Sequence, residues 1–229
     1  MASLTFQNLN KIYPNGFVSV KDFSLHIEDK ELVAFHGPHG CGKSTILRMI
    51  GGLEDISSGE IYLGDTLLND VYPRDRQLAM LFQNYRLYGH LNVYDNIALG
   101  LRIRSLPKNI IEERVNIATK FLGIHKILEQ KIKNISELEK QCVGIARALV
   151  CKPKVLLIDE EFAHQDAALH ERLLMDMLRI NRELGITTLF VTNDLDSAMR
   201  CGQKIVLMKA GELIEVIDKR TENNEDSWL

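Results

Sequence analysis

The sequence predicts an α/β fold on a mainly parallel sheet, with a small antiparallel β subdomain near the N-terminus and an inserted α-helical subdomain. Short runs of almost entirely apolar residues recur at 32–36, 78–82, 155–159, 187–192 and 205–209. Such runs are typical of parallel strands that are buried on both faces. Helical stretches separate most of them, as expected where crossover helices join parallel strands.

The first third of the chain contains strands of two kinds. SLTFQNLNKIY (3–13), VSVKDFSLHI (18–27) and GEIYLGD (59–65) mix apolar and polar residues, as antiparallel strands with one solvated face do. LVAFHG (32–37) is apolar almost throughout and ends at a glycine, which favours a buried strand followed by a tight loop.

Residues from about 107 to 150 are predicted to be mainly helical. Pro107 begins a charged amphipathic stretch, Gly123 interrupts it, and Ser136 begins another helix. We therefore predict one domain over 1–229, in which residues 1–84 and 153–215 form the core and β subdomain. Residues 85–152 are predicted to form the helical subdomain, and 216–229 a polar tail.

Composition limits the function classes. The chain has 229 residues, 45% hydrophobic residues and a formal net charge of -3. This balance gives no support for nucleic-acid binding, which normally requires a basic face. The scattered cysteines (Cys41, Cys142, Cys151, Cys201) show no metal-like spacing, and the chain has neither a signal-peptide layout nor an apolar run of the ~20 residues that span a membrane. We expect an intracellular protein with reduced thiols.

GPHGCGKST (37–45) lies between a predicted strand and a predicted helix, and matches the phosphate-loop pattern G-x-x-x-x-G-K-S/T. Its glycines permit backbone angles that direct N–H groups toward phosphates, and the helix N-terminus adds partial positive charge. Lys43 is predicted to reach the outer phosphates and Ser44 to ligate Mg²⁺, whereas His39 and Cys41 occupy variable positions without assigned chemistry. The predicted ATP-binding residues are Gly37, Pro38, His39, Gly40, Cys41, Gly42, Lys43, Ser44 and Thr45.

A second motif, VLLIDEE (155–161), ends an apolar strand with carboxylates. Alone, this would usually be a solvated turn. Downstream of a phosphate loop, it indicates that Asp159 holds the Mg²⁺ shell and that Glu160 polarises an attacking water.

With these motifs located, residues 3–215 resemble the ATPase subunits of ABC transporters, whose fold is a P-loop NTPase core, and most closely those of maltose-type carbohydrate importers. RDRQLAMLFQNY (74–85) and VYDNIALGLR (93–102) carry the likeness to the sugar-importer branch. The resemblance implies that Tyr13 stacks on adenine. It also implies that Gln83 bridges Mg²⁺ and the groove that receives a membrane subunit.

The resemblance implies the cofactors ATP and Mg²⁺, permease subunits docked through residues 83–101, and a second ATPase subunit as dimer partner. It further implies a cytoplasmic protein on the inner face of the cell membrane. Importer ATPases of this type usually carry an extra C-terminal regulatory domain, which we expect to be absent because the sequence ends at residue 229.

Three departures from the family pattern affect the site. Where the family signature reads Ser-Gly-Gly-Gln, this chain has Ser136, Glu137, Leu138 and Glu139. The switch position after 187–192, a histidine in the family, is Asn193. After Glu160, the segment 161–166 retains only the final aspartate, Asp166, which the family uses as a dimer contact.

The altered signature has a physical consequence. Ser136 and Glu139 fit a capping box, which would satisfy the helix N-terminus internally instead of leaving it free to cap the partner's ATP. A carboxylate about 5 Å from a phosphate charge costs about 3 kcal/mol at an effective dielectric near 20, against about 1–3 kcal/mol from the serine hydrogen bond. Asn193 retains a donor but cannot carry charge, which would slow the chemistry about a hundredfold.

Four functions remain open. We favour an ATP-binding importer subunit with a partly degenerate site, paired with an intact sister ATPase and weakly active alone. The alternatives are a homodimer that hydrolyses ATP slowly, a regulatory or assembly module without turnover, and an ABC ATPase that acts on DNA or ribosomes.

Overall fold

The computed structural model describes residues 3–82, 87–159 and 167–220. A six-stranded sheet forms its centre, with strand order β10-β9-β3-β8-β7-β6. The strands are β3 (Leu32–His36), β6 (Leu78–Leu81), β7 (Val155–Asp159), β8 (Thr187–Thr192), β9 (Lys204–Lys209) and β10 (Glu212–Asp218). All neighbouring pairs are parallel except β10 with β9. The predicted α/β class and the five predicted apolar strands are confirmed.

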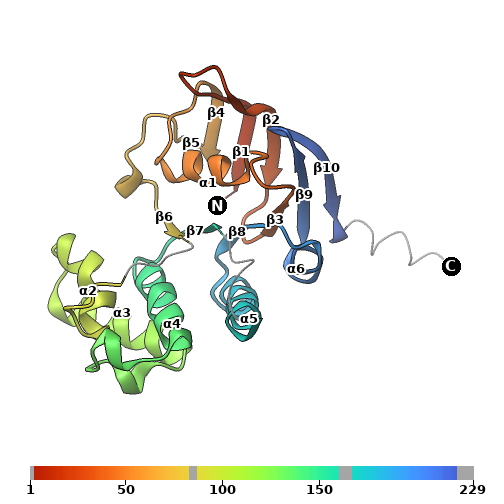
Figure 1. The fold of residues 1–229 in the computed structure, drawn as a ribbon. Helices are drawn as coiled ribbons and strands as arrows, with labels where there is room; N and C mark the ends of the chain where they lie inside the picture. Colours follow the sequence, from red (N-terminus) through yellow and green to blue (C-terminus); the bar gives the residue numbers. More distant parts are fainter. Residues whose placement is uncertain (1–2, 83–86, 160–166, 221–229) are drawn as a thin grey trace.

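A four-stranded antiparallel sheet lies on one side of this centre (Figure 1), with strand order β2-β1-β4-β5. Its strands are β1 (Leu4–Ile12), β2 (Val18–Ile27), β4 (Ser58–Leu63) and β5 (Thr66–Leu67). The predicted N-terminal antiparallel sheet is therefore present. The alternating apolar residues of β1 and β2 point toward the core because successive side chains of a strand face opposite sides.

The α-helices are α1 (Lys43–Gly51), α2 (Val93–Ile103), α3 (Lys108–Phe121), α4 (Glu137–Leu149), α5 (Ala167–Leu184) and α6 (Leu195–Cys201). Short 3-10 turns lie at Pro73–Asp75, His125–Ile127 and Ile132–Asn134. Helices α2, α3 and α4 form a group beside the sheet, while α1 packs beneath the antiparallel sheet (Figure 1).

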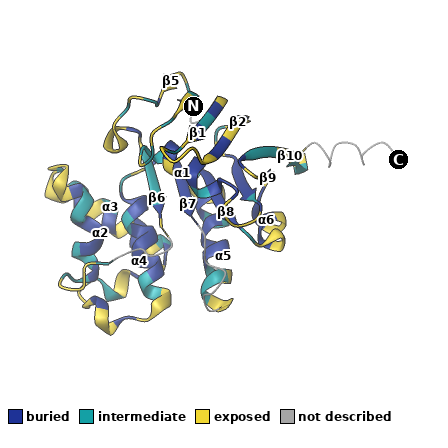
Figure 2. Ribbon diagram, turned by 45° about the horizontal axis from the view of Figure 1, so that its top comes forward, coloured by how far each residue is buried: buried dark blue, intermediate teal, exposed yellow. Residues whose placement is uncertain are grey.

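The central strands divide the core into two layers. In β3, Val33 and Phe35 face α1 and the antiparallel sheet, whereas Leu32 and Ala34 face the side covered by α2 to α6. Burial is continuous along β7 and β8 in Figure 2, and exposed residues lie mainly on the outer helices and turns. This two-sided burial explains why these strands are apolar at nearly every position.

Helix α2 lies within the predicted helical subdomain, and strand β10 extends beyond the predicted core. Helix α2 begins before the helical stretch predicted from Pro107, and Asn92 caps it by accepting a hydrogen bond from the Asp95 amide at 2.7 Å. Strand β10 follows a two-residue turn at Ala210 and Gly211, with φ angles of 50° and 86°. It continues to Asp218, inside the segment predicted as a polar tail.

Candidate nucleotide-binding site

The phosphate loop leaves the carboxyl end of β3, at the edge of the sheet where β7 and β8 also end. Strand β3 pairs with β8, and β8 with β7, so residues that follow these strands converge. The predicted segments 37–45, Asp159 and Asn193 all come from this edge. Ligands of open α/β sheets bind at such carboxyl-end crevices.

Lys43 is held inside the loop that it serves. Its Nζ donates to the carbonyl oxygen of Gly37 at 2.7 Å and to that of Pro38 at 2.9 Å, and Lys43 is only 5% exposed. A buried ammonium needs such acceptors. The Cys41 Sγ lies 3.6 Å from the same Nζ, so the loop wraps around the cation on several sides.

The loop glycines act in two different ways. Gly42 has φ 102°, and a Cβ there would lie 2.2 Å from the backbone oxygen of Ser19. Gly37 does not have a positive φ, so backbone angle does not explain it; a Cβ at Gly37 would lie 2.2 Å from the backbone oxygen of Met208. The turn between β9 and β10 also braces the loop, because the Gly211 amide donates to the Cys41 carbonyl oxygen at 3.1 Å.

Ser44 and Asp159 are brought together at the base of the loop. The Ser44 Oγ donates to Asp159 Oδ1 at 2.7 Å, and Arg48 Nη2 lies 4.0 Å from Asp159 Oδ2. Asp159 is only 7% exposed, a position in which a carboxylate favours a cation. These hard oxygen donors fit Mg²⁺, which typically takes one or two protein ligands and completes its shell with phosphate and water. In the described parts of the chain, no cluster of three or more His, Cys, Asp or Glu side chains could hold a metal ion by itself.

A pocket of about 270 Å³ connects these groups. It is lined by Tyr13, Phe17, Ser19, His39, Gly40, Gly42, Lys43, Ser44, Thr45, Arg48, Val191 and Asn193. The sequence analysis did not predict Phe17 and Arg48, although Phe17 follows Tyr13 closely and Arg48 lies one helical turn beyond Ser44. The Tyr13 and Phe17 rings stack with centroids 6.3 Å apart and an interplanar angle of 23°.

Tyr13 is fixed on its other side by charged neighbours. Its hydroxyl donates to Glu54 Oε2 at 3.3 Å, and Lys11 Nζ, itself 2.7 Å from Glu54, lies 5.0 Å from the ring centroid. The hydrogen bond from Lys11 is the largest cause that lowers the pKa of Glu54. These contacts hold the Tyr13 ring at the pocket.

Asn193, the predicted switch residue, contacts the phosphate loop directly. Its Nδ2 lies 3.2 Å from Nδ1 and 3.3 Å from Nε2 of His39. Three other predicted site residues, Gln83, Glu160 and Asp166, lie outside the described residues.

The predicted capping box of α4 is present. Ser136 Oγ accepts from the Glu139 amide at 3.3 Å, and Glu139 Oε2 accepts from the Ser136 amide at 2.8 Å. Glu137 also pairs with Lys140 Nζ at 2.6 Å, a neutralising contact that the sequence analysis did not include. None of the residues that line the pocket comes from α4, which lies away from α1 in Figure 1.

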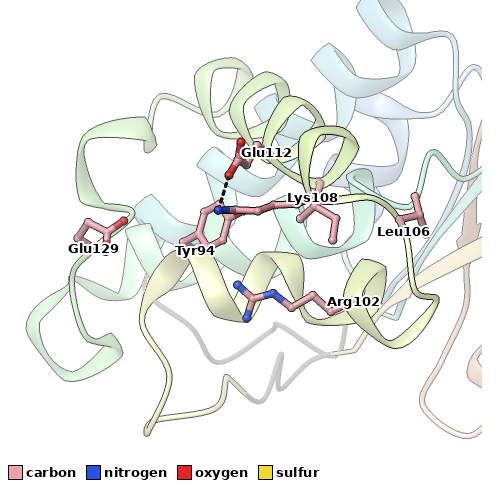
Figure 3. Close-up of a pocket in the computed structure, with 7 residues that line it drawn as sticks. Tyr94, Arg102, Leu106, Lys108, Glu112 and Glu129 are labelled. Atoms are coloured by element: carbon pink, nitrogen blue, oxygen red, sulfur yellow. Dashed lines mark ion pairs between the residues drawn. The ribbon is translucent and has the colours of Figure 1, made fainter.

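A second cavity, of about 480 Å³, lies between α2 and α3 (Figure 3). Its lining combines apolar groups with charges of both signs: Tyr94, Arg102, Leu106, Lys108, Ile111, Glu112 and Glu129. The Arg102 guanidinium lies 5.6 Å from the Tyr94 ring centroid, and Lys108 pairs with Glu112 at 3.6 Å. Within the predicted docking segment 83–101, Val93 is fully buried in the core and Tyr88 is 46% exposed.

The sheet, the loop and its acidic partner define a phosphate-loop nucleotide-binding protein. The family model described as ABC transporter matches residues 20–163, and the chain belongs to this family. Within the described residues, no helix is long and apolar enough to cross a membrane.

Known proteins similar to this chain include sugar and glycerol-phosphate import proteins. The oligosaccharides import ATP-binding protein MsmX of Bacillus subtilis is 44% identical over 94% of this chain and 59% of its own length. The sn-glycerol-3-phosphate import ATP-binding protein UgpC of Psychromonas ingrahamii is 44% identical over 94% of this chain and 58% of its own. This chain therefore spans less than two thirds of the length of these relatives.

Solved structures share the fold. The ATP-binding cassette MJ0796, in a dimeric post-hydrolysis state bound to ADP and Pi, aligns with a TM-score of 0.80 and 28% identity, covering 94% of this chain and 98% of that one. CbiO1 of Clostridium perfringens, part of the transporter complex cbiONQ, aligns with a TM-score of 0.83 and 28% identity, covering 97% and 91%.

Proposed function

We propose that this protein is the ATP-binding, energy-coupling subunit of an ABC importer for a carbohydrate or a similar small solute, working on the inner face of the cell membrane. The names of its relatives support import as the process, because these proteins import oligosaccharides and glycerol phosphate.

One observation carries the nucleotide assignment. Lys43 and Ser44 line a pocket whose lining also includes the stacked aromatic pair of Tyr13 and Phe17, and Asp159 accepts a hydrogen bond from Ser44 at its edge. The loop amides and the Lys43 ammonium can bind phosphates, and the oxygens of Ser44 and Asp159 can bind Mg²⁺. The aromatic pair offers a face on which a purine can stack. A nucleoside triphosphate with Mg²⁺ matches all three groups of residues.

We further propose that the chain pairs with a second ATPase whose signature is intact. Its own α4 begins with a closed capping box, which gives the Ser136 and Glu139 amides partners within the chain, and its two first-turn glutamates favour the helix dipole over an incoming anion. ATP bound at Lys43 would be capped by the partner, while the partner's ATP would face Ser136 and Glu137. Hydrolysis by this chain alone is accordingly expected to be weak, with Glu160 as the group that polarises water.

Permease docking is proposed for the surface of residues 83–101 and the adjoining cavity between α2 and α3. The lining of that cavity combines the apolar side chains of Leu106 and Ile111 with charged groups of both signs. Such a surface suits an amphipathic helix from a membrane subunit. Leu106→Asp should reduce capture of the permease subunits while leaving ATP binding intact. Undiminished capture would count against this surface.

The nucleotide assignment is tested by thermal unfolding with and without Mg²⁺-ATP. At about a hundred times the dissociation constant, a ligand that binds only the folded state adds about 2.7 kcal/mol of stability. We expect a clear rise in the melting temperature of the wild type and none in Lys43→Ala. Absence of any rise at millimolar ATP in the wild type would refute ATP binding.

A further inference from the structure

A third cavity, of about 260 Å³, lies where the C-terminal ends of α5 and α6 meet the residues that follow β10. In Figure 1, β10 ends beside α6, and α5 lies on the same side of the central sheet. The described residues that line this cavity include no carboxylate, but they include four cations: Arg182, Arg200, Lys219 and Arg220. None of the residues that line it also lines the nucleotide pocket.

Two of the cations are held by carboxylates that do not line the cavity. Arg200 donates two hydrogen bonds to Glu171, at 2.7 and 2.8 Å. Arg220 donates to both carboxylate oxygens of Asp218, at 3.0 and 2.7 Å. These pairs offset the charge of both arginines and fix their orientation. A guanidinium has five N–H groups, so each arginine retains donors for a ligand.

Arg182 and Lys219 have no carboxylate partner. Within the described residues neither forms an ion pair, and the Lys219 Nζ contacts the backbone oxygen of Met199. Arg182 lies in the last turn of α5, and Met199 in the last turn of α6, so the helix dipoles favour a cation at each place. Each dipole amounts to only about half an elementary charge, and much of the positive charge therefore remains uncompensated.

The cavity also has apolar lining residues. Leu32 is 1% exposed, and Leu178 is partly buried against the same core cluster. The volume lies just below the ~300–1,000 Å³ that is typical of small-molecule pockets. The combination of cations with an apolar wall suits a small anion that carries a short uncharged group, more than it suits a bare inorganic ion.

We propose that this cavity is a second ligand site, which binds a small organic phosphate monoester. A phosphate monoester carries about two negative charges at neutral pH, which matches the two cations that have no carboxylate partner. The planar guanidinium of Arg182 can bind two phosphate oxygens at once, and the Lys219 ammonium adds a compact positive charge. The group esterified to the phosphate then packs against Leu178.

The test is titration calorimetry of monobutyl phosphate into the purified full-length chain. The double variant Arg182→Gln/Lys219→Gln should raise the dissociation constant at least about tenfold, because it removes two charge-assisted hydrogen bonds. Arg182→Gln alone changes one exposed side chain and should raise the constant about threefold or more. Melting temperatures without ligand verify that both variants are folded. Inorganic phosphate should bind the wild type more weakly than the ester, since it lacks the apolar group.

Two controls separate this cavity from other sources of binding. Lys126→Gln/Lys133→Gln removes the same charge from two exposed turn lysines outside the cavity, and should leave the constant unchanged. Lys43→Ala disables the nucleotide pocket and should still bind the ester, whereas Arg182→Gln/Lys219→Gln should still bind ATP.

Three results would overturn the proposal. One is an unchanged dissociation constant for monobutyl phosphate in folded Arg182→Gln/Lys219→Gln. Another is loss of ester binding in Lys43→Ala, which would place the ester in the nucleotide pocket. The third is equal weakening in the control that lacks Lys126 and Lys133, which would mean non-specific attraction by charge. Equal affinity of the wild type for inorganic phosphate and for the ester would refute the assignment of an organic ligand.

Discussion

Gly42 shows at the scale of one residue how the loop depends on the absence of a side chain. Its φ of 102° and the oxygen of Ser19, 2.2 Å from where a Cβ would lie, are independent obstacles to any other residue. Gly40 has φ 75° and nothing within 4 Å of the same position. The two glycines are therefore a matched pair for substitution. Both have a positive φ, but only at Gly42 would an added Cβ also clash with a neighbouring backbone atom.

Gly40→Ala is expected to cost about 1 kcal/mol of stability through its backbone angle alone. Gly42→Ala should cost clearly more, because the backbone of β2 or of the loop must also move. Chemical denaturation of both variants measures the difference. Equal losses would mean that the packing of Gly42 against Ser19 contributes little.

The sequence predicted the site residues whose chemistry follows from a motif. Lys43 and Ser44 could be assigned because the phosphate-loop pattern names them, and Asp159 because it ends an apolar strand. The contact between His39 and Asn193 could not be predicted, since it depends on β3 and β8 being neighbours in the sheet. Phe17 was missed because no spacing rule distinguishes it from an ordinary exposed aromatic residue.

At the scale of elements, α4 was predicted more accurately than α2. The capping box of α4 is a local pattern of side chains, and the structure contains both of its hydrogen bonds. Helix α2 carries an equally local cap at Asn92 and lies within the predicted helical subdomain, but its bounds do not follow from the motifs in its sequence. Strand β10 was missed because its turn, Ala210 and Gly211, is a weak sequence signal even though both residues have positive φ.

The start of α4 yields a prediction for the element as a whole. Replacing Glu137 and Leu138 by glycine and Glu139 by glutamine removes two carboxylates and opens the helix N-terminus. The glycines should cost about 1 kcal/mol each, which the gain in phosphate capping should exceed once ATP is bound. We expect a larger ATP-dependent dimer fraction by sedimentation, measured with Glu160→Gln to limit hydrolysis.

A matched variant isolates the charge. Lys140 pairs with Glu137 at 2.6 Å, so the repulsion at this end of α4 is already partly offset. Lys140→Gln in the wild-type background should weaken ATP-dependent dimerisation further if electrostatics disables this face. An unaltered dimer fraction in both the restored and the Lys140→Gln chains would show that charge is not the cause.

At the scale of the whole molecule, an ion cluster ties the end of β10 to the central sheet. Glu31 lies before β3, is 2% exposed, and pairs with Lys204 of β9 at 3.1 Å and with Arg220 at 2.5 Å. Asp218 shares Arg220, and this hydrogen bond is the largest cause that lowers the pKa of Asp218 to about 2. The folded-state pKa lies below the unfolded one, so the contribution is present above about pH 4 and is lost as the pH falls toward 2.

The exposure of Arg220 screens the pair, so we expect a contribution of about 1 kcal/mol at neutral pH. Asp218→Asn should lower the free energy of unfolding by this amount at pH 7 and show a smaller decline than the wild type between pH 4 and pH 2. Denaturation curves across that range measure it. Parallel declines in the two proteins would mean that Asp218 is not paired in solution.

The proposed function requires that this chain combine a working ATP pocket with a signature helix that cannot cap its partner. Mixing two variants of this chain, each with one of the two properties altered, tests the properties separately. A variant with Glu137→Gly, Leu138→Gly and Glu139→Gln carries a restored signature, and adding Lys43→Ala disables its own pocket. The wild type then supplies the pocket and the variant supplies the cap, so only a mixed dimer contains a complete site.

The decisive measurement is the ATPase rate of the two proteins mixed at varied ratios, compared with the sum of their separate rates. We predict a mixed rate well above the sum, highest near equal amounts, and abolished when the wild-type partner also carries Lys43→Ala. A rate equal to the sum at every ratio, with both proteins folded and the wild type binding ATP, would contradict the account.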